Sequence, residues 1–186
     1  MSISTNGLKN GMALNLPEGL MTVVEFQHVK PGKGGAFVRT KLKNMRTGAV
    51  IDKTFRSDEK VGHATIDKRE MQYLYREGAD YVFMDNATYD QIHVSTQALG
   101  DSVHYLKEGD LAVLPMWEDE VLGVDLPAAV ELVVTETEPG LQGDRVSGAR
   151  KAATMETGVI VQVPLFIEVG EKLKIDTRTG EYLTRA

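Results

Sequence analysis

Residues 22–42 read TVVEFQHVKPGKGGAFVRTKL, and this stretch decides the class of fold. Its first part, residues 22–29, is rich in β-branched and aromatic side chains. Its last part, residues 36–42, alternates apolar with polar or basic side chains. A period of two is typical of a strand with one buried face. Glycines and a proline dominate residues 30–35 between them, so the stretch predicts a β-hairpin whose tip carries Lys33.

Short strands separated by turns continue along the rest of the chain. We expect a second hairpin in which residues 72–75 and 81–84 flank a turn at residues 76–80. Further strands are predicted at residues 111–114, 120–124, 130–135, 159–163, 172–176 and 182–184. Helical periodicity is weak, and only residues 88–92 and 101–106 suit a helical turn or two. Short strands with turn signals about every 8–12 residues are typical of small β-barrels or sandwiches.

Two changes in composition divide the chain. Residues 61–64 separate a basic stretch from an acidic one, and Pro127 falls between two predicted strands, where it cannot donate to a ladder. The predicted domains are residues 1–63, 64–127 and 128–186. A glycine-acidic turn precedes a strand both at residues 108–113 and at residues 169–175. This similarity indicates either a duplicated module or two ordinary turns that look alike.

Length and composition exclude several classes of protein. The chain has 186 residues, 42% of them hydrophobic, which fits one domain or a few small ones. It has no cysteine, which excludes disulfides, thiol nucleophiles and Cys-ligated zinc. Its apolar runs are far shorter than the ~20 residues of a membrane span. The first residues, MSISTN, lack the basic and apolar regions of a signal peptide, so we expect a cytoplasmic protein.

The net charge hides an uneven distribution. Its value of −6, from 21 basic and 27 acidic side chains, argues by itself against a nucleic-acid partner. Divided at the predicted boundaries, the three domains hold ten basic and five acidic, four and thirteen, and seven and nine side chains. Their net charges are therefore +5, −9 and −2. Between Phe26 and Ile51 there are six basic residues and no acidic one, so the first domain favours a polyanionic partner.

The tip of the first hairpin is the most unusual feature of the sequence. Gly32, Gly34 and Gly35 leave almost no bulk beside Lys33, so a single ammonium group stands on a slim arm. Such an arm suits a narrow polyanionic crevice, and the alternative interpretation is an ordinary solvated turn. The tip is not a Walker-type phosphate loop, because Lys33 precedes two glycines and a strand.

A row of basic side chains follows the tip. Arg39, Lys41 and Lys43 recur at every second position of the predicted strand and therefore share one face. Their spacing of roughly 6.5–7 Å suits a row of phosphates. The alternative is a solvated strand face, but the absence of an interleaved acidic residue favours a polyanion.

Residues that could carry catalysis or bind a metal form no recognisable pattern. The four histidines are scattered, without the pairing four residues apart of a zinc helix. The sequence contains no Gly-x-Ser-x-Gly nucleophile elbow. A hydrolase that uses two carboxylates stays open as the weakest option, because such pairs form in space and not in sequence. We therefore expect a protein that is not an enzyme and that uses no metal and no cofactor.

Four segments, taken in order, resemble bacterial translation elongation factor P. They read VKPGKGGAF at residues 29–37, YLYREGADYVFMD at 73–85, VQVPLFI at 161–167 and DTRTGEY at 176–182. The C-terminal signature of the family is also satisfied, by Lys151, Ala153, Gly158, Val163, Pro164, Ile167 and Gly170. The resemblance extends over almost the whole chain, from Asn6 to Arg185.

This resemblance implies an all-β fold of three small β-barrel domains, a KOW/SH3-like barrel followed by two OB-folds. They are expected to form an L that mimics the outline of tRNA. Members bind the 70S ribosome between the peptidyl-tRNA and exit sites and promote peptide-bond formation at consecutive prolines. Lys33 matches the lysine that approaches the CCA end in the peptidyl-transferase centre and that many bacteria extend by covalent modification. The implied partners are peptidyl-tRNA, especially prolyl, and a lysine-modifying enzyme, for a monomer without a membrane partner.

The resemblance also assigns expected roles to other residues. Support of the Lys33 loop falls to Pro31, Gly32 and Gly34. Contact with tRNA or ribosomal RNA is expected of Lys30, Arg39, Lys41 and Lys43. A third-domain loop with Gly143 and Asp144 is expected near the exit-site codon, and Tyr182 and Arg185 near tRNA and the small subunit. Departures from the commoner family pattern occur at Ala87, Ala153 and Ser147-Gly148-Ala149, which bear on loop geometry.

Other functions fit parts of the sequence. A divergent paralogue that serves different stall motifs is the nearest alternative, although the lysine tip disfavours it. The hypusine-bearing archaeal and eukaryotic factor has two domains and would end near residues 130–150. A small-ligand or oligosaccharide-binding barrel would need an aromatic groove, and only 6% of the residues are aromatic.

Overall fold

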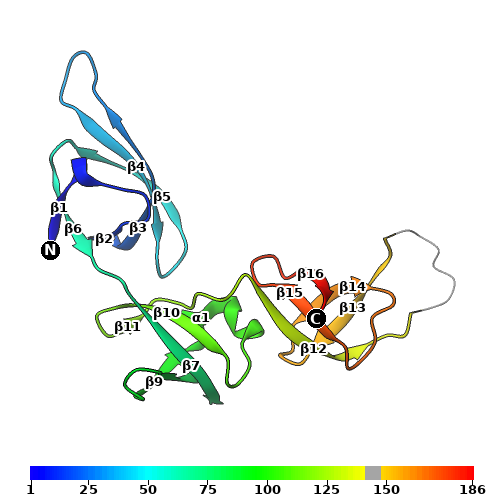
Figure 1. The fold of residues 1–186 in the computed structure, drawn as a ribbon. Helices are drawn as coiled ribbons and strands as arrows, with labels where there is room; N and C mark the ends of the chain where they lie inside the picture. Colours follow the sequence, from blue (N-terminus) through cyan, green and yellow to red (C-terminus); the bar gives the residue numbers. More distant parts are fainter. Residues whose placement is uncertain (141–147) are drawn as a thin grey trace. The chain divides into compact units, whose positions relative to one another are not determined.

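The computed structural model describes residues 1–140 and 148–186, and it is built almost entirely of strands in three sheets (Figure 1). The first sheet has six strands in the order β1-β6-β2-β3-β4-β5. Their bounds are β1 Ser2–Ser4, β2 Ala13–Leu16, β3 Gly19–Val29, β4 Phe37–Asn44, β5 Val50–Arg56 and β6 Lys60–Ala64. Leu14, Val38 and Leu42 form the fully buried centre of its core. The predicted hairpin of residues 22–42 is confirmed as β3 and β4.

A short 3-10 helix, η1 (Thr5–Gly7), follows β1 and bridges the far end of the first sheet. The backbone N–H of Thr5 donates to the carbonyl of Glu59, and its hydroxyl donates to the carbonyl of Arg56, both at 2.8 Å. Thr5 is fully buried, so its polar atoms need these partners. These bonds link the chain after β1 to the end of β5 and to the turn before β6.

The second sheet has five strands in the order β11-β10-β7-β8-β9. Their bounds are β7 Asp67–Glu77, β8 Asp80–Asp85, β9 Gln91–Ser95, β10 Leu111–Trp117 and β11 Glu120–Val121. Between β9 and β10 lie a single helical turn, α1 (Thr96–Leu99), and the 3-10 helix η2 (Gly100–Tyr105). The expected helical turn at 101–106 is confirmed. That at 88–92 is wrong, because Asp85 holds a tight turn and β9 begins at Gln91.

The third sheet has five strands in the order β14-β13-β12-β15-β16. Their bounds are β12 Ala129–Thr137, β13 Arg150–Met155, β14 Ile160–Pro164, β15 Lys172–Asp176 and β16 Tyr182–Arg185. The sequence analysis predicted no strand at residues 150–155, and this expectation is wrong. Residues 150–155 form β13 because Ala153 and Met155 alternate inward and are buried, whereas the flanking polar side chains hid this pattern.

The two glycine-acidic turns that look alike in the sequence share their backbone geometry. In each copy, one strand residue donates its N–H to the carbonyl of the acidic residue and accepts from the N–H of the glycine, over 2.7–2.9 Å. A register shift follows that strand residue in both sheets. The equivalent residues lie 61 positions apart: Tyr73 and Val134, Gly109 and Gly170, and Asp110 and Glu171. The second and third sheets therefore form the same backbone hydrogen bonds at equivalent positions.

The described residues form two compact units. The first comprises residues 1–68 and 115–123, and the second comprises residues 69–114 and 124–186. In the first unit, Leu122 joins Ala13, Leu20 and Ala64 in a buried apolar cluster, and Met45, Ile66 and Trp117 pack against it. The barrel-like all-β class is confirmed, whereas the domain boundaries at 63/64 and 127/128 and the L arrangement stay predictions. Within the part of the chain that the structure describes, every helix is too short to cross a membrane.

Candidate functional site

The loop between β3 and β4 extends beyond the end of the two strands (Figure 1), and it carries Lys33. The ladder ends at the pair Val29 and Phe37, so residues 30–36 extend beyond the last cross-strand bond. A Cβ added at Gly32 or Gly35 would meet nothing within 4 Å. Gly34 adopts φ +113°, which an L side chain rarely reaches, so a glycine is needed there.

Charge on this loop is uncompensated within the described residues. Lys30 and Lys33 are both exposed, and neither forms an ion pair with any residue of 1–140 or 148–186. The pyrrolidine ring of Pro31 lies 3.9 Å from the position a Gly34 Cβ would take, which supports the turn from inside. The loop thus holds the Lys33 ammonium on a narrow projection, as the sequence predicted, and a second free ammonium group, that of Lys30, lies at its base.

The basic side chains of β4 alternate with buried residues, as predicted. Their charge, however, is partly compensated by acidic residues of neighbouring strands. Arg39, Lys41 and Lys43 are exposed, while the residues between them are buried. Neighbouring strands place Glu25 and Asp52 on either side of Lys41 in register, and the Lys41 Nζ lies 4.0 Å from the Glu25 Oε2. The sequence between these basic residues contains no acidic residue, but strand pairing brings acidic residues beside one of them.

The other two basic residues of β4 keep more of their charge free. Arg39 lies between Gln27 and Thr54, and Lys43 between Thr22 and Val50, so their direct neighbours are neutral. The guanidinium of Arg39 lies 5.4 Å from the centroid of the Phe37 ring, which fixes it near the base of the loop. A hollow of about 410 Å³ lies over this part of the sheet, and its lining includes Arg39, Lys41 and the two acidic neighbours of Lys41.

The third sheet carries Tyr182 and Arg185 on β16. Tyr182 is half-buried and packs against the core of that sheet. The Arg185 Nε lies 2.8 Å from the Glu171 Oε2, and its guanidinium lies 4.7 Å from the centroid of the Phe166 ring. Arg185 is half exposed but compensated, so it presents an oriented guanidinium and not a free charge. Gly143 and Asp144, also expected at the site, lie outside the described residues.

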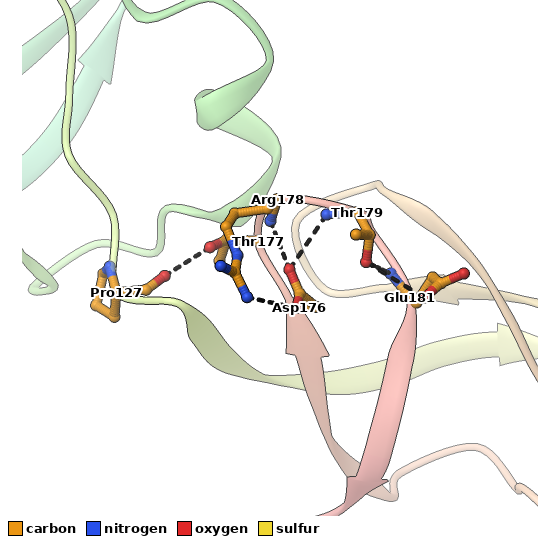
Figure 2. Close-up of polar contacts among 6 residues, drawn as sticks. All are labelled: Pro127, Asp176, Thr177, Arg178, Thr179 and Glu181. Carbon is orange, nitrogen blue, oxygen red and sulfur yellow. Dashed lines mark hydrogen bonds and ion pairs between the residues drawn. The ribbon is translucent and has the colours of Figure 1, made fainter.

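The β15–β16 hairpin turn is held by a network of polar contacts (Figure 2). The Asp176 Oδ1 accepts from the backbone N–H of Arg178 at 2.8 Å and of Thr179 at 3.2 Å. These two bonds stabilise the ionised carboxylate and lower the pKa of Asp176 below its ordinary value. The hydroxyl of Thr177 donates to the carbonyl of Pro127 at 2.6 Å, while Arg178 is left largely exposed.

The same six-residue turn occurs once in each sheet. The side chain of its first residue accepts from the N–H of the third and fourth residues over 2.7–3.3 Å. The threonine at its fourth position accepts from the sixth N–H at 3.3 Å. The fifth residue has φ of +63° or +74°. The three turns are Asn44–Ala49 between β4 and β5, Asp85–Asp90 between β8 and β9, and Asp176–Glu181 between β15 and β16.

The sequence analysis overlooked one residue of these turns. The Arg46 Nε and Nη2 donate to the two carboxylate oxygens of Glu120, at 2.8 and 2.6 Å, inside the first unit. This pairing raises the pKa of Arg46 and lowers that of Glu120. The similar pentapeptides NMRTG at 44–48 and DTRTG at 176–180 were the available signal.

The charged groups near these features suit the binding of an anion. No group of three His, Asp or Glu residues suited to a metal ion occurs among residues 1–140 and 148–186. The arrangement offers free ammonium groups, a guanidinium and exposed backbone, which are groups that bind phosphates. Chemically it is a surface for recognition.

Family models match almost the whole chain. "Elongation factor P (EF-P) KOW-like domain" matches residues 4–61, and "Elongation factor P (EF-P) OB domain" matches residues 66–124. "Elongation factor P, C-terminal" matches residues 130–185. The three models follow one another in the order of the three sheets.

Curated relatives agree over the full length. The chain is 62% identical over 183 residues to Elongation factor P of Acidothermus cellulolyticus, covering 98% of each chain. It is 61% identical over 183 residues to Elongation factor P of Streptomyces avermitilis, covering 98% of this chain and 97% of the relative. Among solved structures, translation initiation factor 5A from Methanococcus jannaschii matches with a TM-score of 0.55 and 22% identity. That match covers 68% of this chain and 92% of the other, and it supports the fold alone.

Proposed function

This chain belongs to the elongation factor P family of translation elongation factors, which are not enzymes, and from this premise we propose a specific role on the ribosome. The chain binds between the peptidyl-tRNA and exit sites and promotes peptide-bond formation at consecutive prolines. It does so by positioning peptidyl-tRNA and not by reacting with it.

A single observation carries this proposal, namely the free Lys33 ammonium on a loop that glycines keep narrow. A compact point charge of this kind suits the phosphates of a CCA end inside a confined centre. Proline is a poor nucleophile because its ring constrains the attacking nitrogen, so a correctly held peptidyl-tRNA has much to gain. In ideal systems, positioning supplies up to about 7–11 kcal/mol of a reaction barrier.

The basic face of β4 supports the same role, and its three basic residues are expected to contribute unequally to phosphate binding. We assign the stronger phosphate contacts to Arg39 and Lys43, whose cross-strand neighbours are neutral. Lys41 contributes less, because Glu25 and Asp52 compensate its charge. Lys30 extends the positive surface to the base of the loop.

Contacts at the other end of the tRNA fall to the third sheet. We propose that Tyr182 and Arg185, whose guanidinium is oriented by Glu171 and Phe166, contact tRNA and the small subunit. Gly143 and Asp144 are proposed to act near the exit-site codon. The factor acts in the cytoplasm as a monomer without a cofactor, and Lys33 is the residue on which a lysine-modifying enzyme would act, with no modification as the alternative.

A reconstituted translation assay tests the role of Lys33. A reporter with several consecutive proline codons is translated without the protein, with the wild type, and with Lys33→Ala. The wild type should raise full-length product and Lys33→Ala should lose most of that gain, because the ammonium is removed from the loop tip. Lys9→Ala, which removes another exposed lysine of the first unit, should act as the wild type does.

Two further outcomes bear on the proposal. A wild-type protein that leaves proline stalling unchanged would refute the assignment of function. A Lys33→Ala protein as active as the wild type would refute the role of the loop alone. The intact mass of the protein from its native host reports any extension of Lys33.

A further inference from the structure

Arg56, the last residue of β5, is a cation of the first sheet that the proposed function leaves unused. Strand β5 lies beside β4 and runs back toward the Lys33 loop (Figure 1). Arg56 is exposed, whereas Phe55 before it is buried in the core. In the ladder it pairs with Phe37, the first residue of β4 after the loop. Arg56 therefore lies on the outer face of the sheet, at the end that carries the loop.

Strand pairing places Arg56 beside Arg39 on this face. Arg39 follows Phe37 by two positions on β4, so the two side chains point to the same side of the sheet. The direct neighbour of Arg39 on β5 is Thr54, which makes Arg56 its diagonal neighbour. Diagonal positions of paired strands lie about 7–8 Å apart. The two arginines belong to different strands, so only the register of the sheet brings them together.

The two guanidinium groups have no carboxylate partner within residues 1–140 and 148–186. The nearest acidic residues along the chain from Arg56 are Asp58 and Glu59, in the turn after β5. The Glu59 carboxylate accepts from the backbone N–H of Arg56 at 3.0 Å, and that of Asp58 accepts from the side-chain amide of Asn6. These two acids lower the local positive potential, but they leave the donors of the Arg56 guanidinium free.

Acidic residues on the outer face lie in the next row of the sheet, around Lys41. Glu25 and Asp52 are the direct neighbours of Lys41 on β3 and β5. This row separates Lys43 from Arg39 along β4. A chain of phosphates that followed β4 would pass between two carboxylates, which repel it. A chain that crosses from β4 to β5 nearer the loop meets neutral side chains between the two guanidinium groups.

The surroundings of the pair direct a polyanion toward the loop. The Arg39 guanidinium lies 5.4 Å from the centroid of the Phe37 ring, so it is held in place before a ligand arrives. Phe37 is half-buried and lies directly opposite Arg56. Lys30 and Lys33 continue the positive surface beyond the last cross-strand pair, and both are exposed. Four cations without ion-pair partners among the described residues therefore surround the base and tip of the loop.

We propose that Arg39 and Arg56 bind two successive phosphates of one RNA strand, which crosses the sheet from β4 to β5 at the base of the Lys33 loop. Each guanidinium donates to the oxygens of one phosphate, for which its planar fork is suited. The inference rests on the proposed function, because it takes the strand to belong to peptidyl-tRNA. It adds Arg56 to the residues that bind this RNA and fixes the direction in which the strand runs over the sheet.

Fluorescence anisotropy of the full chain with a labelled RNA stem that ends in single-stranded CCA tests this pair over a range of salt concentrations. Loss of one phosphate contact lowers the slope of log K against log salt concentration by about 0.7–0.9. Arg56→Gln should therefore lower the slope by this amount and weaken binding about five- to eight-fold near 0.1 M salt. Arg39→Gln should do the same, and the double variant should lower the slope about twice as much. Arg56→Lys keeps the charge and should keep the slope.

Lys9→Gln is the control, because it removes one exposed positive charge elsewhere in the first unit and should keep the wild-type slope. The Arg56 side chain is exposed and has no partner in its own chain, so both variants should melt as the wild type does. Three results would overturn the proposal. They are an Arg56→Gln protein with the wild-type affinity and slope, an equal loss in Lys9→Gln, and a wild type that does not bind this RNA at low salt.

The reporter with consecutive proline codons separates this inference from the proposed function. Arg56→Gln should need more protein than the wild type for the same yield of full-length product, because its RNA contact is weaker. If the wild type raises the yield and Arg56→Gln does so at the same concentration, the guanidinium pair is refuted and the proposed function stands. If the wild type does not raise the yield, the proposed function is refuted, and the binding measurement still decides whether Arg56 contacts RNA.

Discussion

The fifth residue of each six-residue turn has a left-handed backbone conformation, which favours glycine at that position. Gly48 and Gly180 have φ +74°, and Tyr89 has φ +63°. An L side chain in this region costs about 1–2 kcal/mol, whereas glycine loses about 0.5–1 kcal/mol of additional backbone entropy on folding. The balance favours glycine at the fifth position, so we expect Tyr89 to lower the stability of its turn.

Tyr89→Gly should therefore stabilise the folded protein by about 0.5–1 kcal/mol. The exposed ring contributes little packing that would be lost. Urea denaturation followed by circular dichroism measures the change, and Gly48→Ala should move the midpoint in the opposite direction. A Tyr89→Gly protein less stable than the wild type would show that the ring packs in solution.

Gly62 on β6 is a second position where the addition of one carbon atom should change the stability of the fold. A Cβ there would lie 2.5 Å from the backbone oxygen of Asn15, which cannot move without disturbing the β2–β6 ladder. Gly62→Ala should destabilise the protein by about 1–3 kcal/mol. Gly7→Ala, which meets open space, is the matched control and should stay within about 0.5 kcal/mol of the wild type. Thermal denaturation compares the two.

At the scale of elements, the six-residue turn links local sequence to sheet register. Its first side chain satisfies two backbone N–H groups that the reversal of direction would otherwise leave unpaired. The fourth-position threonine satisfies a third. The turn therefore encodes its own geometry, and the flanking strands begin in a fixed register.

This construction predicts a pH dependence for the third turn. The folded-state pKa of Asp176 is lowered, so its stabilisation is present above the unfolded-state pKa near 3.8 and is lost as pH falls through the folded value. Hydrogen exchange of the Arg178 and Thr179 amides should accelerate in that acidic window, after correction for intrinsic rates. Asp176→Asn should abolish this additional acid sensitivity. An unchanged profile in Asp176→Asn would mean that other carboxylates control the turn.

Elements with a clear local signal were predictable, and those defined by neighbours were not. The period of two in residues 36–42 predicted β4 and its exposed basic face correctly. The same sequence could not predict the compensation of Lys41, because Glu25 and Asp52 reach it only through strand pairing. Strand β13 was missed because the burial of Ala153 and Met155 depends on the third core and not on local polarity.

On the scale of the whole molecule, the residues that join different segments are mostly apolar. In the first unit, Leu122 is 9% exposed within its cluster, whereas the side chains of Arg46 and Glu120 are 47% and 46% exposed. Exposed ion pairs are screened by water and salt, while apolar burial is not. The cluster should therefore dominate the attachment of residues 115–123.

Leu122→Ala should cost about 2–4 kcal/mol, and Arg46→Ala should cost clearly less. The effect of Arg46→Ala should also shrink as salt rises from low to molar concentration, whereas that of Leu122→Ala should persist. Urea denaturation at two salt concentrations measures both. A larger and salt-resistant effect of Arg46→Ala would reverse this ranking.

The 61-residue offset between the second and third sheets has a consequence for ancestry. Lys107 and Glu168 occupy equivalent positions, and each accepts through its backbone carbonyl from the N–H of its acidic partner, Asp110 or Glu171. Opposite charges are tolerated there because main-chain atoms make the bond. A frame held by main-chain groups, one glycine and one acidic residue leaves other positions free to diverge. The same bonds join Gly11 and Met12 to Val23 in the first sheet, so this geometry occurs in all three sheets, and only its constant 61-residue spacing in the second and third points to tandem duplication.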